Sequence, residues 1–155
     1  MKKREKRQLE AERIETLIGG LSRDEKVREM KNYLQHGRIT TYDHCFSVAR
    51  RSYRINRSLH LHADEKVLLT SAMLHDFFLY DWHVGDGTNR LHGYHHADTA
   101  MENARKYFDI GAKEQSAIWS HMWPLNITRV PKSREAWIIC LADKLCSIEE
   151  TVFKR

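Results

Sequence analysis

The segment SAMLHDFFLYDWH, Ser71–His83, places two polar side chains where an apolar helix should face a core. Leu68 and Ala72 lie on one stripe at helical spacing, and the next positions of that stripe are His75 and Asp76. A buried carboxylate without a partner is costly unless it becomes protonated or meets a positive charge. The segment therefore predicts a buried polar site inside a helical fold.

Apolar residues recur at helical spacing along most of the 155-residue chain, and no stretch alternates convincingly as a strand would. The pattern predicts an all-α protein of six or seven helices. The expected elements begin with a first helix broken at Gly19-Gly20 and a second from the capping pattern Ser22–Glu25 to Gly37. Thr41 and Asp64 are the expected caps of helices over residues 42–60 and 65–80, and further helices are expected over residues 96–108, 112–122 and from 133 onward. We divide the chain into a helical extension, residues 1–36, and a main helical domain, residues 37–155, which together form one compact unit.

Composition and charge narrow the class of protein. The chain has no apolar run long enough to cross a membrane and no signal-peptide pattern, so we expect a cytoplasmic protein without a membrane partner. Its three cysteines lack metal-knuckle spacing and read as reduced thiols. The net charge of +5 is concentrated in MKKREKRQLEAER, residues 1–13. This segment could contact nucleic acid, but its mixed charges favour a solvated helix, and we do not expect a nucleic-acid partner.

Further polar residues lie on the apolar faces of other expected helices: His44, His96, His121 and Asp143. Each alone is readily explained as a hydrogen-bonded core residue. Together with His75 and Asp76, they would bring imidazoles and carboxylates to one interior point, where a divalent cation would compensate them. Such a mixed ligand set suits Fe, Mn, Co, Ni or Zn, and Mg is also allowed.

The order of these residues is similar to a known signature. His44 in YDHCFSVAR, His75-Asp76 in SAMLHDFF and Asp143 in CLADKLCSIEE resemble the H…HD…D pattern of the HD-domain metal-dependent phosphohydrolases. The resemblance covers roughly residues 40–150. In HGYHHAD and IWSHMWPL, His96 and His121 resemble the two extra histidines of binuclear members, and His95 is the alternative to His96. The GYP motif of one binuclear subgroup is absent, so cyclic-di-GMP specificity is not implied.

The resemblance implies a site and a reaction. His44, His75, Asp76 and Asp143 would hold a first metal ion, and Asp76 would bridge to a second that His96 and His121 complete. One or two divalent ions would activate a water that attacks phosphorus in line, which requires no serine or cysteine nucleophile. The implied substrate is a phosphorylated, nucleotide-like small molecule with a phosphoester or phosphoanhydride bond.

Several residues near the expected ligands are candidates for substrate contacts. Lys144 follows Asp143 and is either a catalytic, phosphate-binding lysine or a surface lysine. Arg51 could attract an anionic substrate. Trp82 and Trp123 could stack on a base, although aromatics at such positions are more often core residues. The glycine-bearing loop over residues 81–94 is a candidate gate.

Two other functions stay open at this stage. Some binuclear HD-domain proteins are di-iron oxygenases that activate oxygen. Alternatively, the chain could be a non-catalytic, metal-stabilised sensor or nucleic-acid-binding module, which the basic N-terminus alone supports. The sequence leaves a homo-oligomer open and gives no role to His36, His60 or His62.

Overall fold

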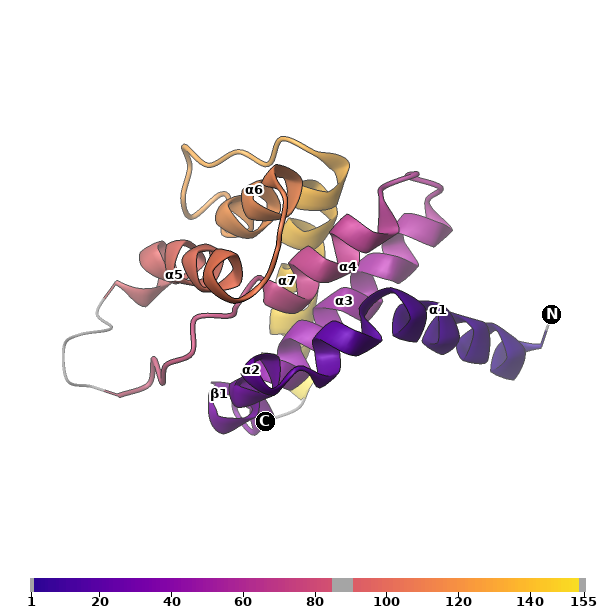
Figure 1. Cartoon of the computed structure of the whole chain (residues 1–155), viewed down its shortest axis with the longest axis horizontal. Coiled ribbons are helices and arrows are strands. Elements are labelled where there is room, and N and C mark those ends of the chain that lie inside the picture. The colour runs from indigo at the N-terminus through magenta and orange to yellow at the C-terminus, as the bar shows by residue number, and fades with distance from the viewer. Residues whose placement is uncertain (1, 85–90, 154–155) are drawn as a thin grey trace.

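The computed structural model describes residues 2–84 and 91–153 (Figure 1). The described residues form seven α-helices, one short 3₁₀ helix and a two-stranded hairpin, which confirms the predicted all-α class. In chain order the elements are α1 (Lys3–Arg23), α2 (Glu25–Arg28), η1 (Glu29–Asn32), β1 (Leu34–His36), β2 (Ile39–Thr40), α3 (Thr41–Ser58), α4 (Glu65–Leu74), α5 (His92–Tyr107), α6 (Ala112–Ser120) and α7 (Arg134–Phe153).

Helix α4 occupies the centre of the fold. It packs against α1, α3, α5, α6 and α7 (Figure 1), and each of its residues from Leu68 to Leu74 is buried. A helix that is apolar around its whole circumference belongs in such a central position. Ile14 and Ile18 of α1 are buried in the same hydrophobic cluster as Leu68. The N-terminal extension therefore shares the core of the main domain.

Side-chain caps fix where the two helices that lead to the site begin. Asp64 accepts a hydrogen bond from the Val67 amide at 3.0 Å and starts α4, as the sequence predicts. Thr40, one residue before the predicted cap, accepts a bond from the Asp43 amide at 3.1 Å and starts α3. Each cap satisfies a backbone amide that has no partner within its helix.

The predicted break at Gly19-Gly20 is wrong, because α1 continues through both glycines to Arg23. A glycine inside a helix costs only about 1 kcal/mol relative to alanine, less than burial of the neighbouring Ile18 contributes. The predicted cap at Ser22 is also wrong. Its hydroxyl donates to the Gly19 carbonyl at 3.1 Å inside α1, while Asp24 caps α2 by accepting a bond from the Lys26 amide at 2.8 Å.

The expected helix up to Gly37 is replaced by shorter elements. Helices α2 and η1 end at Asn32, and β1 pairs antiparallel with β2 across a turn in which Gly37 has a positive φ of 58°. Only glycine adopts that backbone conformation without steric cost. The strand alternation of β1 leaves Leu34 exposed and turns Gln35 into the interior. The hairpin thus brings a polar side chain toward the centre of the fold.

Helix α4 was predicted to reach residue 80, but it ends at Leu74, and α5 begins at His92, earlier than predicted. The chain turns at once, since the Phe78 amide donates to the Asp76 carbonyl at 2.8 Å. The amide of Asn103 holds this turn by donating to the carbonyls of Phe77 and Phe78. The proposed gate over residues 81–94 lies partly outside the described residues.

None of the helices in the described part of the chain combines the length and the apolar character that a membrane crossing requires.

Candidate metal centre

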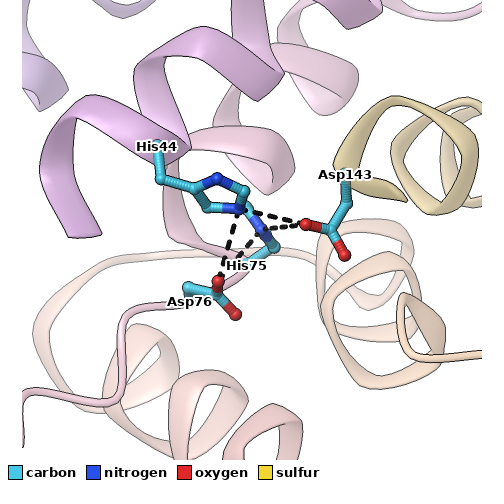
Figure 2. A group of neighbouring side chains, drawn as sticks. All are labelled: His44, His75, Asp76 and Asp143. Carbon is cyan, nitrogen blue, oxygen red and sulfur yellow. Dashed lines mark hydrogen bonds and ion pairs between the residues drawn. The ribbon is translucent and has the colours of Figure 1, made fainter. Parts of the chain in front are cut away.

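Four of the six predicted residues form one tight group, drawn in Figure 2. His44 comes from α3, Asp143 from α7, and His75 and Asp76 from the segment just after α4. The Nε2 atom of His44 lies 3.0 Å from Asp143 Oδ1, and the Nε2 atom of His75 lies 3.3 Å from Asp76 Oδ2 and 3.5 Å from Asp143 Oδ1. All four residues are buried, and their candidate ligand atoms lie within 4.8 Å of one another.

Asp76 also belongs to a second group, with His96 of α5 and His121 at the end of α6. Asp76 Oδ1 lies 3.2 Å from His96 Nε2 and 3.4 Å from His121 Nε2. The two carboxylate oxygens of Asp76 therefore face different groups. Oδ2 faces His44 and His75, whereas Oδ1 faces His96 and His121.

The early end of α4 explains how His75 and Asp76 reach the centre together. On a continuous helix the two side chains would point about 100° apart. His75 instead caps the C-terminus of α4, and Asp76 lies beyond it in the turn that Asn103 holds. Releasing Asp76 from the helix lets its carboxylate lie between α3, α5, α6 and α7.

In each of the four histidines of the two groups, the Nδ1 atom has a hydrogen-bond partner. The Nδ1 atoms of His75, His96 and His121 donate to backbone carbonyls three or four residues earlier, at 2.7, 2.9 and 2.7 Å. His44 Nδ1 instead lies 2.8 Å from Oε2 of the buried Glu150. Because these partners are acceptors, each Nδ1 carries a proton, and Nε2 is the ring atom that faces the centre and would bind a cation after losing its own proton.

The inward atoms fit a cation. The Nε2 atoms of His96 and His121 lie 3.0 Å apart, so two lone pairs would face each other when both rings are neutral and protonated on Nδ1. His75 Nε2 and Asp76 Oδ1 are buried and form no hydrogen bond of regular geometry with the described residues, although each lies within 3.5 Å of a side chain that can carry the opposite charge. Uncompensated buried polar atoms are expensive, and a shared divalent ion is the partner that imidazole nitrogens and carboxylate oxygens have in common. These residues could therefore hold a divalent metal.

The electrostatics of the side chains point the same way. Burial lowers the pKa of His44, but its bonds to Asp143 and Glu150 outweigh burial and raise that pKa to about 10. Burial raises the pKa of the Asp76 and Asp143 carboxyls, but the surrounding imidazoles hold both pKa values well below the usual range. The ionised carboxylates thus favour a positive charge beside them. Either protons on the imidazoles or a bound metal ion can supply that charge, and the two compete.

The structure separates the alternatives that the sequence left open at the second group. His96 is buried with its ring toward Asp76, whereas His95 is exposed on the outer side of α5. The His96 register therefore matches the geometry. His92, one turn earlier, stacks on His96 with ring centroids 4.6 Å apart.

Sequence reasoning missed three residues around the centre. Gln35 donates from Nε2 to Asp76 Oδ2 at 2.7 Å, and the ring of His36 lies edge-on to His44 at 5.5 Å. Neither had a signal, since both lie on the unpredicted hairpin. Glu150 did have one, because it follows Asp143 by two helical turns and so shares its inward face.

The centre opens on a pocket of about 1050 Å³, which is large enough for a ligand the size of a nucleotide. Asp76, His96, Asp143 and Lys144 line it, together with Trp82. The half-buried Lys144 donates from Nζ to the carbonyls of His121 and Cys140 at 3.2 and 3.3 Å. Trp82 stacks on the ring of His92, with centroids 4.9 Å apart and planes 7° apart.

The two other candidate substrate contacts lie elsewhere. Arg51 forms an ion pair with Glu149 and lines a separate, smaller cavity. The indole of Trp123 packs edge-on against Trp137, with centroids 5.1 Å apart.

Comparison with known proteins agrees with the site geometry. The family model of the HD domain matches residues 41–148, a stretch that contains all six predicted metal ligands. Neither the comparison with curated proteins nor that with solved structures gives a significant match.

Proposed function

The chain belongs to the HD-domain family, and from this premise we propose that it is a metal-dependent phosphohydrolase. The proposed reaction is the hydrolysis of a phosphoester or phosphoanhydride bond in a nucleotide-like small molecule. The observation that carries the proposal is the division of Asp76, whose two carboxylate oxygens face two separate pairs of histidines.

The proposed first metal position uses His44, His75, Asp76 and Asp143, and the second uses His96 and His121 with the shared Asp76. The mixed nitrogen and oxygen ligands suit Fe, Mn, Co, Ni or Zn, with Mg allowed. A divalent ion held by these residues would lower the pKa of a bound water and would neutralise charge on phosphoryl oxygens. Asp76 is the catalytic carboxylate in this proposal, since it would contribute a ligand to both positions.

Other residues would bind the substrate. Lys144 lies on the pocket wall beside Asp143, and its bonds to two carbonyls hold its ammonium group there. A fixed ammonium group next to the metal centre suits a phosphate oxygen. Trp82 offers an aromatic wall for a base. We assign no substrate contact to Arg51 or Trp123, because neither lines this pocket in the described residues.

The test is elemental analysis of the purified protein, followed by a hydrolysis screen. Nucleotides and dinucleoside polyphosphates would be supplied with Mn²⁺, Fe²⁺, Co²⁺ or Mg²⁺, with D76A as the inactive control. We expect bound metal and chelator-sensitive release of phosphate or a nucleotide. Protein without bound metal under every condition would refute the proposal, and dioxygen consumption by an iron-loaded sample without hydrolysis would replace it with an oxygenase.

A further inference from the structure

The four histidines of the centre are not anchored alike. Three donate from Nδ1 to neutral backbone carbonyls, whereas His44 Nδ1 lies 2.8 Å from a carboxylate oxygen of Glu150. Glu150 is only 2% exposed, and His44 is fully buried. Burying a carboxylate costs free energy unless a nearby group compensates its charge. The contact between Glu150 and His44 therefore indicates a role for this carboxylate at the centre.

We propose that Glu150 is a positioning residue that makes the two metal positions unequal, so that the position containing His44 binds its cation first and more tightly. The inference rests on the metal centre of the proposed function and adds an order of loading to it.

The first step of the argument is the strength of the anchor. A hydrogen bond to a carboxylate is about twice as strong as one between neutral groups. It fixes the ring and the tautomer of His44 as a carbonyl would, and it adds a full negative charge behind the imidazole. Removing such an outer partner of a metal-binding histidine typically weakens metal binding about 10- to 100-fold.

The second step is that Glu150 contacts a ligand of the first position and none of the second in the described residues. Glu150 and Asp143 lie two turns apart on the same face of α7, so one rigid helix supplies both the ligand and the residue behind His44. Within the described residues, the ion pair of Glu150 is with His44, while the neighbouring Arg51 pairs with Glu149. The negative charge of Glu150 is therefore directed toward the first position.

The third step is the poorer charge of the second position. His96 and His121 donate to the neutral carbonyls of His92 and Ile118. The carboxylate that this position has is the shared Asp76, whereas the first position has both Asp76 and Asp143. The first position has two carboxylates and a histidine backed by Glu150, whereas the second, among the described residues, has only the shared carboxylate. We therefore expect the first position to bind a divalent cation clearly more tightly than the second.

The experiment is a Co²⁺ titration of the metal-free full chain, followed by calorimetry and by visible absorption, which reports the coordination of each bound ion. The variant is E150Q, which keeps the shape of the side chain and removes its charge. The matched control is E149Q, which makes the same change one residue away, at a glutamate that faces Arg51. Circular dichroism of the metal-free proteins checks that they fold.

We expect two binding steps in the unchanged protein and in E149Q. In E150Q the tighter step should weaken about 10- to 100-fold, while the weaker step changes less than about twofold. An unchanged tighter step would overturn the inference, and so would equal weakening of both steps, which marks a general structural role. Should E150Q not fold, E150D keeps the charge but withdraws it from His44, and the same selective loss is expected.

The inference and the proposed function fail differently. Absence of Co²⁺ binding by the unchanged protein would remove the metal centre and both proposals with it. Two bound ions with the selective E150Q effect, but without hydrolysis of any substrate, would refute the proposed reaction and leave the role of Glu150 standing.

Discussion

Raising the pH from 6.5 to 9 should destabilise the metal-free protein, because the centre then loses the protons that compensate its carboxylates. The pKa of His44 rises from 6.5 to about 10 in the folded protein, where burial opposes and the Asp143 and Glu150 carboxylates favour the charged ring. A group with a raised folded pKa contributes stability that is complete below its unfolded pKa and is lost as the pH climbs toward its folded pKa. For His44 that window runs from 6.5 to about 10.

The size of the effect follows from the same shift. Between pH 6.5 and 9 the folded protein keeps the His44 proton that the unfolded chain gives up, which amounts to about 3 kcal/mol. The raised pKa values of His75 and His96 act in the same direction. Asp76 and Asp143 add no slope, since their lowered pKa values make a contribution that falls away only in acid. For a chain of this length, about 3 kcal/mol lowers the melting temperature by about 6 to 12 °C.

The assay is thermal unfolding in chelator at several pH values, repeated with Mn²⁺ or Co²⁺ in excess. Metal binding requires deprotonated imidazoles, so affinity should rise with pH and offset the loss in the metal-loaded protein. H44Q should flatten the slope of the metal-free protein. A melting temperature of the chelated protein that is constant or rises from pH 6.5 to 9 would refute the reasoning.

Four substitutions test the rest of the site. D76A should bind neither ion and release no phosphate, as measured by elemental analysis and a phosphate assay; normal turnover would count against the site. H121A should bind one ion where the unchanged protein binds two, and an unaltered metal-to-protein ratio would remove the second position. K144A should keep its metal but raise KM about tenfold through one lost charge-assisted bond, with exposed K132A as the control. W82A should raise KM for a nucleotide about 5- to 100-fold through lost stacking and spare a phosphoester without a base; equal effects on both would exclude stacking.

Helical periodicity indicates which way a side chain points, so the sequence could predict which polar residues face the interior. His44, His96 and Asp143 lie on faces whose other members are apolar, and all three are buried toward one another in the structure. An amphipathic α-helix has one face toward the core, so a polar residue on that face is buried among the other helices. The all-α class followed from the same signal.

The parts that could not be predicted lie where periodicity stops. The hairpin at residues 34–40 is too short to show strand alternation, so no sequence signal indicated that Gln35 contacts Asp76. The end of α4 was misplaced because the apolar residues 77–79 follow the His75-Asp76 pair and continue the helical pattern. The turn after α4 is held by Asn103 of α5, which donates to the carbonyls of Phe77 and Phe78. A contact between residues so far apart in the chain leaves no local pattern in the sequence.

The misplaced helix end has a consequence for the chemistry. Had α4 continued to residue 80, the Asp76 carboxylate would have been confined to one side of a helix and could have faced one pair of histidines. Because the helix stops at Leu74, Asp76 lies in a turn and presents Oδ2 to His75 and Oδ1 to His96, at 3.3 and 3.2 Å. The turn is therefore what allows one carboxylate to contribute to both of the proposed metal positions. N103A, which removes the bonds to the Phe77 and Phe78 carbonyls, should then weaken both Co²⁺ steps together, unlike E150Q, and an effect on one step alone would contradict this role of the turn.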